Sequence, residues 1–122
     1  MILLDTSVWV EHFRTQNTGV ETLLLDGRVF MHDFVLGELA LGGLKTSTNT
    51  FRALEDLPRL PTIEPTTVLH AIYEHRLRGT GIGYVDAHLL IASVLHRARI
   101  WTFDRKLQSA ASTLQVLFKW PE

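Results

Sequence analysis

Four acidic residues stand in unusually apolar surroundings in this 122-residue chain. Asp5 ends a short apolar run near the N-terminus, Glu38 lies within an apolar helical stretch, and Asp86 lies near the start of another. Asp104 follows a third apolar run by two residues. Removing a carboxylate from water is costly unless a cation meets it. Carboxylates that share one crevice suit hard divalent ions such as Mg²⁺ or Mn²⁺, so the chemistry depends on whether these four meet.

Each acid also has a purely structural interpretation. Asp86 and Asp104 fit the first turn of a helix, where the helix dipole favours negative charge. Asp5 fits the N-cap position of a helix. Glu38 gains nothing from a helix end, and its structural alternative is an exposed stripe that it shares with Phe34 and Lys45. Taken one at a time, the aspartates are explained by these roles, so their joint position decides between the two interpretations.

Short apolar runs alternate with helical stretches along the chain. Apolar runs bounded by turn-forming residues predict buried strands, and we expect them at Ile2–Leu4, Val29–His32, Leu60–Ile63, Ile100–Thr102 and Val116–Phe118. The helical stretches are Val8–Arg14, Val20–Leu25, Phe34–Leu44, Phe51–Leu57, Val68–Leu77, Tyr84–His96 and Arg105–Ala111. Thr6 or Ser7 is expected to cap the first helix. This alternation predicts a parallel sheet with helices on both faces.

The expected sheet brings two of the acids together. In an open α/β sheet, ligand crevices form outside the carboxyl ends of the strands. If the strands at Ile2–Leu4 and Ile100–Thr102 flank the point where the strand order reverses, Asp5 and Asp104 fall in the same crevice.

Composition indicates one globular domain, residues 1–122. A hydrophobic fraction of 46% and a charged fraction of 20% suit a packed core. The formal net charge of −1 excludes a polycationic nucleic-acid binder, although a local basic patch could still hold phosphate. Without cysteine, and with no histidine pair spaced by four residues, a zinc site is not expected. No basic leader and no long apolar run appear, so we expect a cytoplasmic protein that does not enter a membrane.

The best basic cluster flanks the strand that leads to Asp104. It consists of Arg97, Arg99, Arg105 and Lys106. In the structural interpretation these side chains are simply exposed to solvent at the rim of the domain. In the functional interpretation they guide a substrate phosphate towards the adjoining acids.

The acids and their neighbours also form four motifs in a familiar order. These are Leu4-Asp5-Thr6-Ser7-Val8-Trp9, then Gly37-Glu38-Leu39 followed by Gly42, then Gly81-Ile82-Gly83-Tyr84-Val85-Asp86-Ala87-His88, and finally Trp101-Thr102-Phe103-Asp104-Arg105-Lys106-Leu107. In these motifs the chain resembles the PIN-domain ribonucleases, and within them the VapC toxins of bacterial toxin–antitoxin pairs. Each motif alone is weak, but four in this order and spacing make a specific match.

The resemblance implies a flavodoxin-like, three-layer α/β/α sandwich with a five-stranded parallel sheet. It implies that Asp5, Glu38, Asp86 and Asp104 form one acidic site. The hydroxyls that hold the carboxylates in place would be those of Thr6, Thr102 and Ser7.

The resemblance also implies an activity, a cofactor and partners. Two like charges about 4 Å apart repel by roughly 4 kcal/mol at an effective dielectric constant of 20, so either some of the acids are protonated or cations balance them. We therefore expect a Mg²⁺- or Mn²⁺-dependent endoribonuclease toxin in which Asp5, Asp86 and Asp104 are the principal metal ligands. Glu38 would be a further ligand or would orient the attacking water. The expected partners are an RNA substrate, a VapB-like antitoxin and a second copy of the chain.

Three other functions can be weighed against this one. A catalytically idle PIN-fold protein-interaction module would not need all four acids. A phosphoacceptor receiver domain would need an acidic pair after the first strand, which Asp5-Thr6-Ser7 does not supply. A phosphatase of the haloacid-dehalogenase type would need Asp-x-Asp there, and Ser7 occupies the second position.

Overall fold

The central strand of the sheet is β1 (Ile2–Leu4) in the computed structural model, which describes residues 1–122. It pairs in parallel with β2 (Val29–Phe30) on one side and with β3 (Arg99–Trp101) on the other. All three residues of β1 are buried. A central strand covered by helices on both faces needs apolar side chains pointing in both directions, which Ile-Leu-Leu provides.

The structure has three strands where the resemblance implied five. The two remaining expected strands are reduced to single parallel bridges, Met31 with Arg59 outside β2 and Ile100 with Leu117 outside β3. At the first bridge, Pro58 and Pro61 flank the paired residue, and a proline has no N–H to continue a ladder. The expectation of a parallel α/β sheet is therefore confirmed, but the edge strands are shorter than the sequence indicated.

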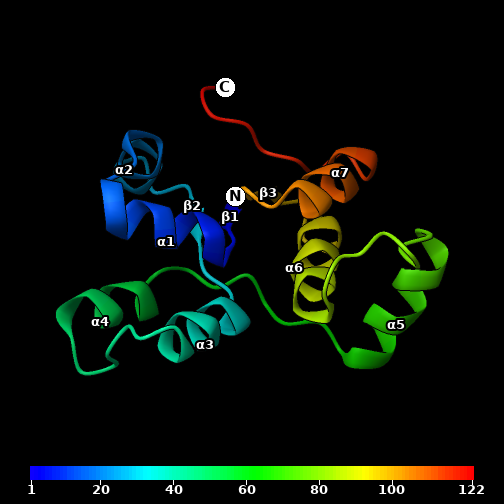
Figure 1. The fold of residues 1–122 in the computed structure, drawn as a ribbon, viewed down its shortest axis with the longest axis horizontal. Coiled ribbons are helices and arrows are strands. Elements are labelled where there is room, and N and C mark those ends of the chain that lie inside the picture. Colours follow the sequence, from blue (N-terminus) through cyan, green and yellow to red (C-terminus); the bar gives the residue numbers. More distant parts are fainter.

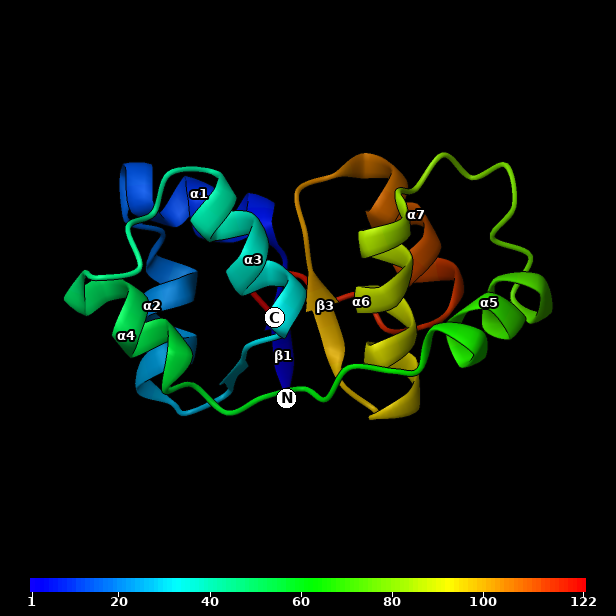
Figure 2. The same cartoon turned by 90° about the horizontal axis from the view of Figure 1, so that it is seen from below.

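Helices lie on both sides of the strands. Figures 1 and 2 show α1 (Thr6–Thr15), α2 (Thr18–Leu25), α3 (Asp33–Leu41) and α4 (Asn49–Glu55) towards one side. On the other side lie α5 (Pro65–Glu74), α6 (Tyr84–Leu95) and α7 (Arg105–Thr113), as Figures 1 and 2 also show. On the first side α1 packs against α3, and on the second α6 packs against both α5 and α7.

Helix α6 is the most deeply buried helix. Seven consecutive residues, Ala87–Ser93, are buried, because β3 covers one of its faces and α5 and α7 cover others. This explains why its sequence is apolar with little periodicity. No helix of the structure has the length and apolar character needed to cross a membrane.

Two of the helices begin directly at the carboxyl ends of strands. Asp5 follows β1 and is the N-cap of α1, with the backbone N–H of Val8 donating to its side chain. Asp104 follows β3 and caps α7 in the same way, accepting from Leu107. The expectation that Thr6 or Ser7 caps α1 was wrong. Asp5 takes that position, which leaves both hydroxyls free to make longer-range contacts.

Candidate functional site

Asp5 is the most buried of the four acids, at 5% exposure. Ser7 Oγ donates to its Oδ1 at 2.5 Å, and Thr102 Oγ1 donates to its Oδ2 at 2.6 Å. Burial raises the pKa of Asp5, although these hydrogen bonds oppose that shift. Both carboxylate oxygens are thus held in a fixed orientation; Oδ1 accepts from Ser7 and from the Val8 N–H, and Oδ2 keeps a further lone pair for another ligand.

The same two hydroxyls connect β1 to the segment after β3. Thr102 Oγ1 accepts a hydrogen bond of 3.0 Å from the backbone N–H of Asp104, and Ser7 Oγ accepts one of 3.0 Å from that of Phe103. Each hydroxyl donates to Asp5 and accepts from this segment. Ser7 and Thr102 therefore hold Asp5 and the segment that contains Asp104 together at the carboxyl ends of β1 and β3, as the sequence predicted.

Glu38 joins this region from the neighbouring helix. Thr6 Oγ1, at the first position of α1, donates to Glu38 Oε1 over 2.6 Å. Glu38 is half-buried. It is therefore not part of a freely solvated stripe, the structural alternative that the sequence left open. The contact needs the packing of α1 on α3, since the two residues are 32 positions apart.

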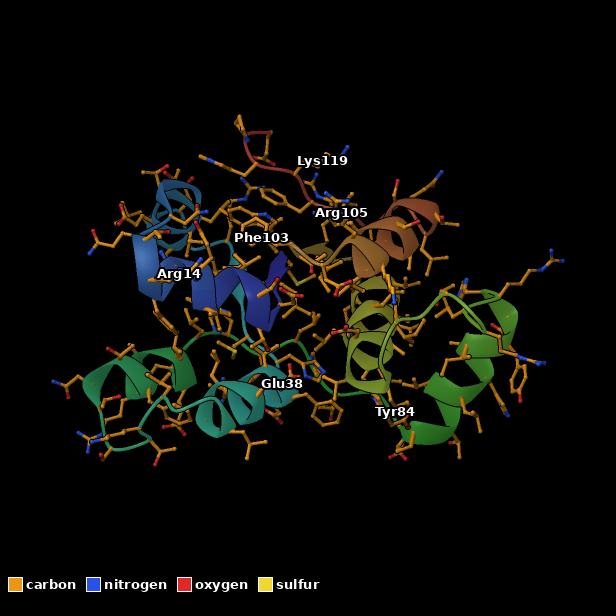
Figure 3. The ribbon with its side chains drawn as sticks, viewed as in Figure 1. Arg14, Glu38, Tyr84, Phe103, Arg105 and Lys119 are labelled. Atoms are coloured by element: carbon orange, nitrogen blue, oxygen red, sulfur yellow. The ribbon has the colours of Figure 1, made fainter.

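Asp86 lies half-buried in the first turn of α6. Burial, and to a smaller extent the negative charges of Asp5, Asp104 and Glu38, together raise its pKa to about 6. All four expected acids are therefore close enough to affect one another electrostatically. Figure 3 shows Glu38 and Tyr84 on one side of this region, and Phe103 and Arg105 on the other. We call Asp5, Glu38, Asp86 and Asp104 the acidic cluster.

Helix N-termini make this concentration of negative charge tolerable. Asp5 and Asp104 cap α1 and α7, and Asp86 stands in the first turn of α6. The positive end of each helix dipole stabilises a nearby carboxylate by roughly 0.3–1 kcal/mol. The structural roles considered for the three aspartates are thus real, and they coexist with the gathering of the acids.

The acidic cluster has donor atoms that suit a hard cation, although its side chains stand apart from one another. Its donors are all carboxylate oxygens, the ligands that Mg²⁺ and Mn²⁺ favour. As the side chains stand, no three Asp, Glu or His residues lie close enough together to hold one metal ion. The charges of Asp5, Asp104 and Glu38 nevertheless add to the effect of burial in raising the pKa of Asp86, so all three lie near it.

The basic cluster expected from the sequence is divided between the amino and the carboxyl ends of the strands. Arg105 and Lys106 begin α7, directly after Asp104. Arg97 and Arg99 lie at the amino end of β3, where Arg99 pairs with Ile2 and its guanidinium donates to Glu122 at 3.1 Å. Residues before a strand lie at its amino end and residues after it lie at its carboxyl end. Of the four cations, only Arg105 and Lys106 therefore lie at the carboxyl end, beside the acids.

Two buried histidines that the sequence did not single out lie between α3 and α6. Phe34 packs against both His32 and His88, with ring centroids 5.0 Å apart in each case. Burial lowers the pKa of His32 to about 4 and also lowers the pKa of His88. His32 is therefore neutral at pH 7, and both rings pack against Phe34. Their only signal in the sequence is a lone histidine within an apolar stretch.

Comparison with known proteins identifies the family. The PIN domain model matches residues 2–112. The chain is also 39% identical over 113 residues to ribonuclease VapC32 from two strains of Mycobacterium tuberculosis, CDC 1551 / Oshkosh and ATCC 25618 / H37Rv. That alignment covers 92% of this chain and 91% of the relative. With the parallel sheet and the acids gathered at its carboxyl edge, these matches confirm the resemblance drawn from the motifs, and the chain belongs to the PIN-domain family.

Proposed function

We propose that this protein is a Mg²⁺-dependent endoribonuclease and the toxin of a VapBC-type pair, with Mn²⁺ as an alternative metal. The observation that carries the proposal is the arrangement of the acids at the carboxyl ends of the strands, where Thr102 links Asp5 to Asp104, Thr6 holds Glu38, and Asp86 lies near enough to be affected by all three. Support also comes from the PIN family match and from a relative, 39% identical, that is named a ribonuclease.

The acidic cluster would hold the metal. Asp5, Asp86 and Asp104 would be ligands, directly or through water, with Glu38 as a further ligand. The bound ion would supply a water of lowered pKa and would offset charge on the scissile phosphate.

The chain's own residues would position the reacting groups. Ser7 and Thr102 hold Asp5 in one orientation, and Thr6 holds Glu38. Glu38, half-buried beside α1, would orient the attacking water by accepting its proton in a hydrogen bond. Hydroxyls that fix the direction of a ligating carboxylate typically contribute tenfold to a hundredfold in metal affinity or activity. Water would add to phosphorus as the P–O bond of the RNA breaks, without a covalent intermediate on the protein.

The proposed reaction can be tested with one acid and a matched control. Asp86→Asn keeps the shape of the side chain and removes a coupled charge, whereas Asp26→Asn makes the same change at an exposed site at the end of α2. Incubated with structured RNAs and Mg²⁺, the Asp86 variant should cleave at least about a hundredfold more slowly, and the Asp26 variant should match wild type. A chelator should abolish cleavage by wild type. Equal cleavage by wild type and Asp86→Asn would contradict the proposal.

The toxin role needs a separate test, because a nuclease need not arrest growth. Induced expression in a bacterial host should stop growth with wild type and not with Asp86→Asn. Co-expression of a VapB-like antitoxin should restore growth, and the complex should elute as one species containing two copies of this chain. Growth arrest by both forms would instead favour a protein-interaction module without catalysis.

A further inference from the structure

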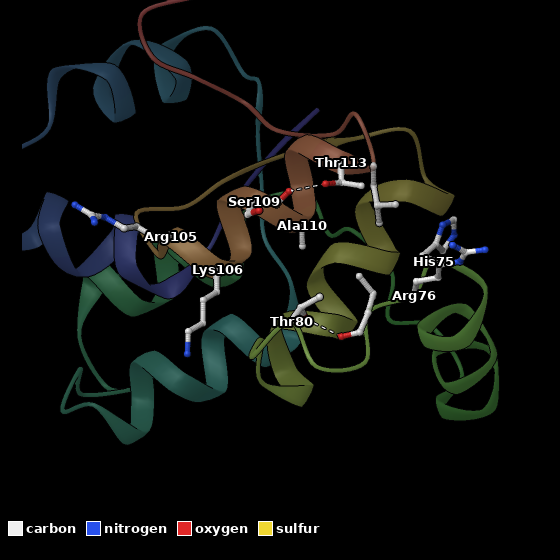
Figure 4. Close-up of a pocket in the computed structure, with 10 residues that line it drawn as sticks. His75, Arg76, Thr80, Arg105, Lys106, Ser109, Ala110 and Thr113 are labelled. Carbon is white, nitrogen blue, oxygen red and sulfur yellow. Dashed lines mark hydrogen bonds between the residues drawn. The ribbon is translucent and has the colours of Figure 1, made fainter.

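A cavity of about 520 Å³ lies between α7 and the residues that follow α5. Its apolar lining is formed by Leu77, Ala110 and Leu114. Figure 4 shows Arg76 at one end of the cavity and Arg105 and Lys106 towards the other, with Thr80 and Ala110 between them. The cavity therefore combines an apolar middle with a cation at each end.

No carboxylate lines this cavity, and its cations have no acidic partner. The three ion pairs of the structure join Arg28 and Arg99 to Glu122, and Arg59 to Asp33. None of them involves Arg76, Arg105 or Lys106. These three cations are therefore left without an ion-pair partner, and unpaired cations in a cavity attract an anionic ligand.

The local backbone places two of the cations. Arg76 follows the end of α5 with φ of +55°, a left-handed conformation that turns the chain away from the helix axis. Lys106 lies along Gly81, where a Cβ would stand 2.9 Å from Lys106 Cδ and 3.1 Å from Nζ. Gly81 therefore leaves the space that the lysine side chain occupies. Thr80 Oγ1 donates to Leu77 O at 2.7 Å and ties this loop down.

One end of the cavity adjoins the acidic cluster. Arg105 and Lys106 are the two residues after Asp104, the N-cap of α7. Arg105 and Ser109 also line a second cavity, of about 550 Å³, that includes Thr102 and Phe103. The two cavities therefore share Arg105 and Ser109 of α7, and the second of them reaches Thr102, which holds Asp5.

We propose that this cavity is a subsite for the RNA strand that flanks the cleaved bond, an inference that rests on the proposed nuclease function. Arg105 and Lys106 contact the phosphate next to the acidic cluster, Arg76 contacts a phosphate further along the strand, and a nucleoside packs on the apolar lining between them. The alternation of cation, apolar surface and cation matches the alternation of phosphate and nucleoside along a nucleic acid.

The test compares two arginines in the same backbone conformation. Arg76 and Arg97 are both exposed, both follow a helix, and have φ of +55° and +56°. Arg97 lies at the opposite edge of the sheet, so Arg97→Asn is a matched control for Arg76→Asn in charge and in backbone demand. Asn is chosen because it tolerates the left-handed region.

The measurement is fluorescence anisotropy of a labelled single-stranded RNA of about 12 nucleotides, in chelator, over a series of salt concentrations. Arg76→Asn should raise Kd by roughly threefold to tenfold and lower the slope of log Kd against log salt by about 0.7, the value for one lost phosphate contact on a single strand. Arg97→Asn should change neither, and Arg76→Lys should restore the slope. Lys106→Gln should act in the same direction as Arg76→Asn, and melting curves of all variants check that they fold.

Equal Kd and equal slope for the Arg76 and Arg97 variants, with Lys106→Gln also unchanged, would overturn the subsite even if wild type cleaves RNA. Failure of wild type to cleave any RNA would instead count against the proposed function. If Arg76→Asn weakens binding of the antitoxin and leaves RNA binding unchanged, the cavity belongs to an acidic segment of that protein, and the RNA subsite is wrong.

Discussion

Thr102 connects two members of the acidic cluster through a single hydroxyl, which donates to Asp5 and accepts from the backbone of Asp104. The side chain is 1% exposed, so water cannot replace either partner. A buried polar group left without its partner costs roughly 1–3 kcal/mol.

Thr102→Val keeps the shape of this side chain and removes both hydrogen bonds. We expect the free energy of unfolding to fall by about 1–3 kcal/mol in urea titrations, and RNA cleavage to fall because Asp5 loses its fixed orientation. Thr102→Ser keeps the hydroxyl and should retain most of both. A valine variant as active as the serine variant would show that Asp5 is oriented without Thr102.

Asp86 makes stability depend on pH in an identifiable direction. Its pKa rises from an ordinary 3.8 to about 6 on folding, so the folded protein binds the proton more tightly than the unfolded chain. Its contribution to stability is therefore complete below pH 3.8 and is lost as the pH rises towards 6. The full shift corresponds to about 3 kcal/mol, and solvent screening of a half-buried group reduces our expectation to about 1 kcal/mol.

Asp86→Asn removes this titration. In chelator, the variant should therefore be more stable than wild type by about 1 kcal/mol at pH 7, and the difference should shrink as the pH falls from about 6 to about 4. Paired urea titrations at several pH values measure it. Taking the difference between the two proteins cancels the titration of His32, whose lowered pKa acts in the opposite direction. A difference that does not vary with pH would contradict the coupling inferred for Asp86.

At the scale of elements, two helical glycines have opposite surroundings. Gly37 is exposed in α3, and a Cβ there would meet nothing within 4 Å. Gly19 is buried in α2, and a Cβ would stand 2.7 Å from the ring of Trp120. The first glycine weakens its helix without a packing reason, whereas the second allows α2 to approach the C-terminal segment.

Alanine at these two sites should therefore have effects of opposite sign. Gly37→Ala should stabilise the protein by about 0.5–1 kcal/mol, since alanine loses less backbone entropy in a helix. Gly19→Ala should destabilise it by about 1–3 kcal/mol, since the half-buried indole ring of Trp120 must shift. Thermal unfolding followed by circular dichroism measures both. Destabilisation by Gly37→Ala would mean that this face of α3 is covered by another surface in solution, such as a second copy of the chain.

At the scale of the whole molecule, a metal ion that binds at the acidic cluster should stabilise the folded state, because the four acids come together only there. A ligand at ten times its Kd stabilises the folded state by about 1.4 kcal/mol, which corresponds to a rise of roughly 3–5 °C in Tm for a chain of this size. Wild type and Asp26→Asn should show this rise with Mg²⁺, and Asp86→Asn should show little of it. Equal shifts in all three proteins would place the ion elsewhere. Because unfolding is measured, the result does not depend on finding the right RNA.

The sequence by itself determined the α/β class and the parallel sheet, and the resemblance of its motifs to the PIN-domain ribonucleases implied which acids gather. The fold class and the positions of the acids follow from local patterns in the sequence. These patterns are apolar runs of strand length, helical periodicity, and acids placed where strands end and helices begin. Asp5, Glu38, Asp86 and Asp104 could be singled out because each stands in apolar surroundings and in a motif shared with the PIN-domain ribonucleases.

Only the tertiary structure decided which groups contact one another. Two of these contacts connect residues far apart in the sequence: Thr6 donates to Glu38, and Arg76 lines the same cavity as Lys106. The structure also showed that the basic cluster is divided between the two ends of the strands. The sequence also overstated the edge strands, because an apolar run does not say how many backbone hydrogen bonds its neighbour can complete. Contacts of this kind depend on how helices pack against a twisted sheet, and local sequence carries no information about that packing.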